Sequence, residues 1–103
     1  MEYTLTTENK RTIITLWGRL DSRRREEFLT AFQLAQEANT EEIVIDLQKV
    51  SFIDSTAVGL LIVAHQKCQH PPKDLRLCVI EGSVKQTLDF LKITDIIPGI
   101  TPQ

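Results

Sequence analysis

The sequence lacks the features of a nucleic-acid-binding or membrane-spanning protein. Aromatic residues make up 6% of the 103 residues, and Trp17 and Tyr3 are the single members of their types. Isolated rings form no stacking platform for single-stranded nucleic acid, and a formal net charge of −2 supplies no basic excess for a phosphate backbone. No apolar run approaches the ~18 residues that a bilayer requires. We therefore expect no nucleic-acid partner and no membrane partner.

Cysteine is scarce as well. Cys68 and Cys78 both lie in segments with an apolar periodicity, so we predict two reduced thiols and no disulfide. The amino-terminal MEYTLTTENK carries Glu2 and lacks the apolar core of a secretory signal. These features predict a cytoplasmic protein.

Common catalytic and metal-binding patterns are missing. The chain has no G-x-S-x-G elbow and no G-x-x-x-x-G-K phosphate loop. A serine nucleophile needs a base within hydrogen-bond reach, and His65 is ~15 Å from Ser55 along a helix. The spacing of His65, Cys68, His70 and Cys78 fits no strong zinc pattern. We expect no enzyme, no metal and no cofactor.

The sequence instead has the pattern of one α/β domain. A chain of 103 residues buries enough surface for one core, so we assign residues 1–103 to a single domain. Residues 2–7 alternate, and residues 12–17 are rich in β-branched and aromatic types, so these two segments predict an antiparallel hairpin. The segment 18–21 (GRLD) ends the second strand, and Asp21 or Ser22 then provides a helix N-cap.

A helix is predicted from Ser22 to about Ala38, because apolar residues recur there at helical spacing. Three cations, Arg23 to Arg25, lie in its first turn, where the helix dipole prefers anions. One interpretation is a solvated face with local pairing to Asp21 and neighbouring glutamates. The other is an exposed docking point for an acidic partner.

Two further units of strand and helix follow. Residues 43–47 predict a strand buried on both faces, followed by a polar passage; Asp46 inside this strand needs a hydrogen-bond partner, and a structural role is favoured over a catalytic one. Residues 57–64 predict a buried helix that ends before Pro71. Residues 75–80 predict the next strand.

The last predicted helix begins at a capping box, with Ser83 as cap and Gln86 three residues later. The tail after Ile93 predicts no more than a short strand or an extended cover. The predicted fold is a small mixed β-sheet, built from an amino-terminal hairpin and then parallel βαβ units, packed by helices.

Asp54, Ser55 and Thr56 form the candidate site, where a buried strand leads into a buried helix. Free backbone N–H groups and the dipole make a helix N-terminus a favourable place for an anion. Ser55 is therefore a candidate phosphate acceptor, with Asp54 and Asp21 adding a negative field. The simpler alternative is that Ser55 or Asp54 is only an N-cap.

This stretch, VIDLQKVSFIDSTAVGLLIVA, resembles the signature of the STAS domain, which anti-sigma factor antagonists and sulfate-transporter tails share. Gly18 to Asp21 resembles the family's Gly-x-Leu-Asp, and residues 79–81 and 84–93 resemble its later strand and helix. Ala57 stands where the family usually has glycine. The longer carboxyl-terminal helix of many antagonists is missing or reduced.

The resemblance implies a binding role. In bacterial antagonists the serine after the motif aspartate is phosphorylated by a kinase that doubles as an anti-sigma factor; here that residue is Ser55, with Thr56 as second choice. The unphosphorylated form binds the kinase, and a phosphatase resets the switch. The implied partner-binding residues are Asp21, Asp54, Ser55 and Thr56, to which we add Arg24 as a candidate contact.

A second hypothesis comes from the helix N-terminus itself. With Arg23 to Arg25 nearby, the Ser55 position is a candidate site for a nucleotide or another small anionic ligand.

Overall fold

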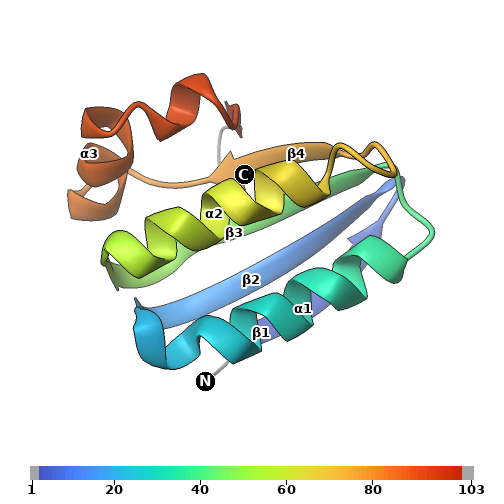
Figure 1. The fold of residues 1–103 in the computed structure, drawn as a ribbon, viewed down its shortest axis with the longest axis horizontal. Coiled ribbons are helices and arrows are strands. Elements are labelled where there is room, and N and C mark those ends of the chain that lie inside the picture. The colour runs from blue at the N-terminus through green and yellow to red at the C-terminus, as the bar shows by residue number, and fades with distance from the viewer. Residues whose placement is uncertain (1–2, 101–103) are drawn as a thin grey trace.

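Five strands form one mixed sheet, and helices pack against it (Figure 1). The computed structural model describes residues 3–100. Its elements are β1 (Tyr3–Glu8), β2 (Arg11–Leu20), the 3-10 helix η1 (Ser22–Arg24), α1 (Arg25–Glu37), β3 (Glu42–Ile53), α2 (Ser55–Lys67), β4 (Asp74–Cys78), α3 (Ser83–Phe90), the 3-10 helix η2 (Ile93–Asp95) and β5 (Gly99–Ile100). The strand order is β1-β2-β3-β4-β5. Only β1 and β2 pair antiparallel, while the other neighbours are parallel, which confirms the predicted fold class.

The core lies between the sheet and the pair α1 and α2. Figure 1 shows these two helices side by side across one face of the sheet and running in the same direction. From residue 11 to residue 17 of β2, every second residue is buried, as Ile14 and Leu16 are, and the intervening side chains are half-buried. On α1, Phe28 and Phe32 stack with ring centroids 6.2 Å apart. The alternation on the strand and the helical spacing on α1 therefore bury one common layer.

The third strand is longer than the sequence predicts. The pattern predicts a strand over residues 43–47 and a polar passage after it, but β3 continues to Ile53. Pairing explains the extension, because Leu20 at the end of β2 pairs with Ile53. The short β4 pairs only as far as Asp46. Beyond that point β3 has one open edge, so polar side chains are tolerated there without ending the strand.

Two predicted helix starts are wrong by a few residues. The predicted helix over residues 22–38 begins as the 3-10 turn η1, and α1 starts at Arg25. Ser83 does not cap α3: Gly82 occupies the cap position, and no side chain accepts a capping hydrogen bond there. Gly82 has φ +147°, a conformation that glycine alone adopts readily, and the helix therefore begins one residue earlier than the capping box predicts.

The predicted fourth strand and tail are confirmed in part. β4 ends at Cys78, two residues before the predicted end, and β5 is the short strand expected in the tail; residues 101–103 lie outside the described residues. Cys68 and Cys78 are free and buried, as predicted, and burial raises the pKa of both thiols. Within residues 3–100, no helix has the length and apolar character to cross a membrane.

The packing of α2 leads to a test of the core. Leu61 is fully buried, whereas Leu34 on α1 is 44% exposed. We expect Leu61→Ala to lower the free energy of unfolding by about 2–5 kcal/mol, because it leaves a cavity in the core. Leu34→Ala should lower the free energy of unfolding by much less than Leu61→Ala does. Urea denaturation measures both variants, and equal losses would contradict the proposed core.

Candidate functional site

Asp54 and Ser55 divide two roles at the start of α2. Asp54 is the N-cap: its Oδ1 accepts a hydrogen bond from the Ala57 N–H at 3.0 Å, and its carbonyl accepts one from the Val58 N–H at 3.2 Å. Ser55 is the first helical residue and is exposed. The capping interpretation is therefore correct for Asp54, and the Ser55 side chain provides no cap.

The N-terminal turn of α2 is suited to an anion. The first N–H groups of an α-helix have no partner within the helix. The Asp54 carboxylate accepts a hydrogen bond from one of them, the N–H of Ala57. The dipole of a helix adds partial positive charge at this end. Thr56, the second hydroxyl, is half-buried, so Ser55 is the more accessible of the two.

The end of β2 brings Asp21 to the same edge of the sheet. Leu20 pairs with Ile53, and each strand continues directly into an aspartate. Asp21 caps η1, with its Oδ1 accepting from the Arg23 N–H at 3.1 Å. Its Oδ2 accepts from the Arg23 guanidinium at 3.2 Å and lies 3.7 Å from Arg19 Nε.

These contacts change the electrostatics predicted for the site. The hydrogen bond from the Arg23 side chain, more than any other contact, lowers the pKa of Asp21. The carboxylate therefore stays charged, but two arginines face it, and the negative field of Asp21 is partly offset. The local pairing expected of the arginine cluster is found here, between Arg23 and Asp21.

Arg24 holds the turn between β2 and α1. Its Nη1 donates to the Trp17 carbonyl at 3.0 Å and to the Arg19 carbonyl. Gly18 has φ +82°, and a Cβ there would lie 3.3 Å from this nitrogen. Glycine at position 18 thus serves both the backbone conformation and the approach of Arg24. A direct contact between Arg24 and a partner stays a prediction.

Phe52 and Arg19 were not among the predicted site residues, although both lie at this edge. Phe52 is 39% exposed, and the Arg19 guanidinium lies 4.0 Å from the centroid of its ring, as a cation–π pair. The two residues are register partners across β2 and β3. The one signal in the sequence is an aromatic residue inside an otherwise polar passage. We define the Ser55 edge as Asp21, Phe52, Asp54, Ser55 and Thr56.

Asp46 has a structural contact, in line with the favoured interpretation. It is half-buried, and its Oδ1 accepts a hydrogen bond from the Gln48 N–H at 3.0 Å. His65 lies in the last turn of α2, at the end of the helix opposite Ser55. Residues 3–100 contain no group of side chains that would hold a metal ion.

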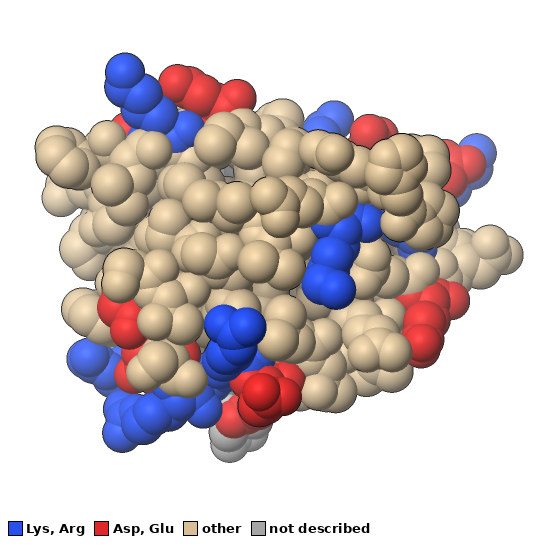
Figure 2. All heavy atoms as spheres, in the orientation of Figure 1, with Lys and Arg blue, Asp and Glu red and all other residues tan. Residues whose placement is uncertain are grey.

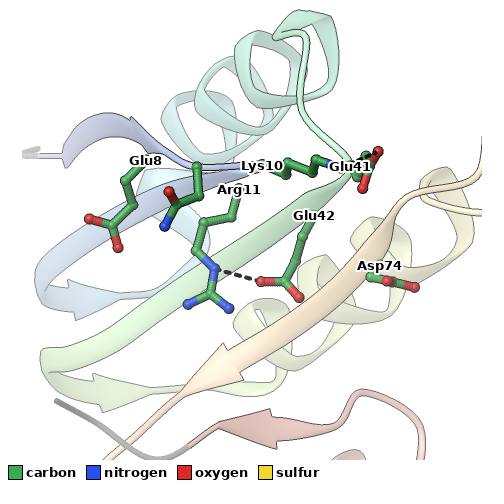
Figure 3. Close-up of a pocket in the computed structure, with 7 residues that line it drawn as sticks. Glu8, Lys10, Arg11, Glu41, Glu42 and Asp74 are labelled. Carbon is green, nitrogen blue, oxygen red and sulfur yellow. Dashed lines mark ion pairs between the residues drawn. The ribbon is translucent and has the colours of Figure 1, made fainter.

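A second, polar hollow lies at the other end of the sheet (Figure 3). It has a volume of about 490 Å³ and is lined by Glu8, Asn9, Lys10, Arg11, Glu41, Glu42 and Asp74. Arg11 Nε lies 2.7 Å from Glu42 Oε1, and Lys10 Nζ lies 3.8 Å from Glu41 Oε1. The lining residues lie at the β1–β2 turn and at the amino ends of β2, β3 and β4, whereas Ser55 follows the carboxyl end of β3. The hollow is therefore separate from the Ser55 edge.

The contact between Arg23 and Asp21 predicts a measurable titration. We expect NMR titration to give Asp21 a pKa below its ordinary value of 3.8. The stability that this carboxylate contributes is therefore present above pH 3.8 and is lost as the pH falls through the lowered pKa of the folded state. Arg23→Ala should raise the pKa of Asp21 toward 3.8, while the control Arg25→Ala should leave it unchanged. A pKa at or above 3.8 in the unaltered protein would contradict the assignment.

Comparison with known proteins identifies the family. A sequence model of the STAS domain matches residues 3–102, while no curated protein matches the chain. Among solved structures, an anti-sigma factor antagonist from Mycobacterium paratuberculosis is 14% identical with a TM-score of 0.87, covering 99% of this chain and 86% of that one. The anti-sigma factor antagonist SpoIIAA in its unphosphorylated form is 17% identical with a TM-score of 0.62 over 88% of this chain and 98% of that one. The Bacillus cell fate determinant SpoIIAA in its phosphorylated form is 18% identical with a TM-score of 0.66 over 99% and 92%. The chain belongs to the STAS domain family.

Proposed function

We propose that this protein is a phosphorylation-switched, protein-binding regulator of the kind that anti-sigma factor antagonists represent. The unphosphorylated form binds a serine kinase that doubles as an anti-sigma factor, and phosphorylation of Ser55 blocks that binding. The observation that carries the proposal is the exposed Ser55 hydroxyl at the first position of α2, directly after a cap that Asp54 provides.

The fold supports a phosphate at Ser55. A phosphoserine carries about −1.5 to −2 charges at pH 7, and an anion at a helix N-terminus is stabilised by about 0.3–1 kcal/mol. Phosphorylation should therefore leave the fold intact. Phosphorylation should instead weaken binding of the partner. A partner surface fitted to the neutral Ser55 hydroxyl must then desolvate a phosphate dianion beside Asp54.

The SpoIIAA structures support the same proposal. That protein was solved in unphosphorylated and phosphorylated forms, and this chain shares its fold and has a hydroxyl exposed at the mouth of α2. We propose a binding role without catalysis, since His65 is at the far end of the helix that begins at Ser55. A phosphatase would reset the switch by removing the phosphate from Ser55. The kinase and the phosphatase would both act in the cytoplasm.

Gly59 gives independent support for a partner at this surface. It lies one turn after Ser55 on α2, is exposed, and has nothing within 4 Å of the position that a Cβ would occupy. A glycine inside a helix costs roughly 1 kcal/mol relative to alanine, and nothing in the free protein requires it here. Close approach of a partner backbone to α2 explains the glycine.

Phosphorylation is tested with the anti-sigma factor kinases of the native cell. We expect one of them to add a single phosphate to the protein, seen by intact mass, with Ser55 as the modified residue in the peptide map. Ser55→Ala should abolish the modification, whereas Thr56→Ala should retain it. Ser55→Asp should weaken kinase binding about tenfold or more without lowering the unfolding midpoint. Unchanged binding of Ser55→Asp, together with unmodified Ser55 and Thr56 in protein from the native cell, would refute the proposal.

The role of Gly59 is tested by adding one methyl group. Gly59→Ala should raise the free energy of unfolding by about 0.5–1 kcal/mol, because the space around it is open. The same variant should bind the kinase more weakly, because the methyl group meets the approaching partner. Thr30→Ala, at an exposed position of α1, is the control that improves helix propensity away from Ser55. If Gly59→Ala raises the free energy of unfolding and leaves kinase binding unaltered, no partner approaches Gly59 closely.

A further inference from the structure

A groove runs between α1 and α2 on their solvent side, and its lining residues do not include those of the Ser55 edge. It has a volume of about 680 Å³ and is lined by Arg25, Leu29, Gln33, Gln36, Val63 and Lys67. Arg25, Gln33 and Lys67 are exposed, and the other three lining residues are half-buried. Figure 2 shows this face: broad areas without charged side chains, two separate basic side chains near the middle, and acidic side chains beside the lower of them and at the margin.

The two cations lie at opposite ends of the groove. Arg25 is the first residue of α1, and Leu29, Gln33 and Gln36 follow it along one stripe of that helix. At the far end, Gln36 Nε2 donates a hydrogen bond to the Lys67 carbonyl at 3.2 Å, which places Lys67 beside Gln36. Eleven residues of α-helix span ~16 Å, so Arg25 and Lys67 are separated by about three helical turns.

The charged residues that line the groove are both basic. Within residues 3–100, neither Arg25 nor Lys67 forms an ion pair, and no acidic residue lines the groove. Glu37, whose Oε2 lies 3.4 Å from Gln33 Nε2, is beyond its margin. Leu29 and Val63 provide an apolar floor between the cations. This order of charge, apolar surface and charge is complementary to an acidic amphipathic segment.

We propose that this groove docks an acidic amphipathic helix of a protein partner. A helix with side chains is about 10–12 Å across, and helices of this type bind in grooves through residues about one turn apart. Carboxylates three turns apart, at positions i and i+11, reach Arg25 and Lys67, and apolar residues at i+4 and i+7 contact Leu29 and Val63. The groove shares no lining residue with the Ser55 edge, although Arg25 directly follows η1, which Asp21 caps.

A synthetic peptide tests the proposal on the full chain. The probe is a helix-forming peptide with Glu at positions i and i+11 and Leu at i+4 and i+7. At low salt, calorimetry should detect binding, and NMR should place the shifts on the methyl groups of Leu29 and Val63. Arg25→Glu or Lys67→Glu should each weaken binding about tenfold. Lys10→Glu, the same reversal at an exposed lysine in the β1–β2 turn, is the control and should have no effect.

A charge exchange gives the sharper result. The double variant Arg25→Glu with Lys67→Glu should bind the matching peptide with Lys at positions i and i+11. Ser55→Asp should leave binding of the acidic peptide unchanged, so that failure here is distinct from failure of the Ser55 switch. Binding that neither reversal weakens would overturn the proposal. Concentration-dependent shifts at Leu29 and Val63 without peptide would also overturn it, since the occupant is then a second copy of the chain.

Discussion

The parallel pairing of β2 with β3, continued as far as Leu20 and Ile53, is the constraint on which the site depends. Both strands end at the same level, and each is followed at once by an aspartate that caps the next helical element. Had β3 ended at residue 47, its last paired residues would lie well before the point where α2 begins. The site is therefore a product of strand length as much as of the residues it contains.

The caps explain why Ser55 is available. Every helix start has N–H groups that need acceptors, and serine is among the residues that often meet that need. Here Asp54 accepts the hydrogen bond from the Ala57 N–H, so the Ser55 hydroxyl is not needed as the helix cap. Asp21 does the same for η1, and its arginine neighbours keep that carboxylate ionised. Two aspartates stabilise the backbone, and the serine that follows the second of them is exposed.

Local pattern was sufficient to predict the fold class and the point where α2 begins. A helix N-terminus at residues 54–56 was predicted from the apolar run, the aspartate and the hydroxyls that follow it. Each of these signals acts within a few residues. The full length of β3, the pair of Arg19 with Phe52 and the contact of Arg24 with the Trp17 carbonyl were not predicted. Each of these depends on which strands become neighbours, and register across a sheet is not encoded in a short window of sequence. The wrong prediction of Ser83 as a cap has a different cause. The N-cap of α3 is Gly82, which has a positive φ, and Ser83 is the first helical residue.

Ala57 and Gly59 lie on opposite sides of α2. Ala57 stands where the family usually has glycine, and its side chain is fully buried, so the extra methyl group is directed into the core. Gly59, two residues later, is exposed and has open space around it. At ~100° per residue, two positions along a helix face nearly opposite directions. The alanine at position 57 therefore adds its methyl group to the core, whereas Gly59 lies on the exposed side of α2.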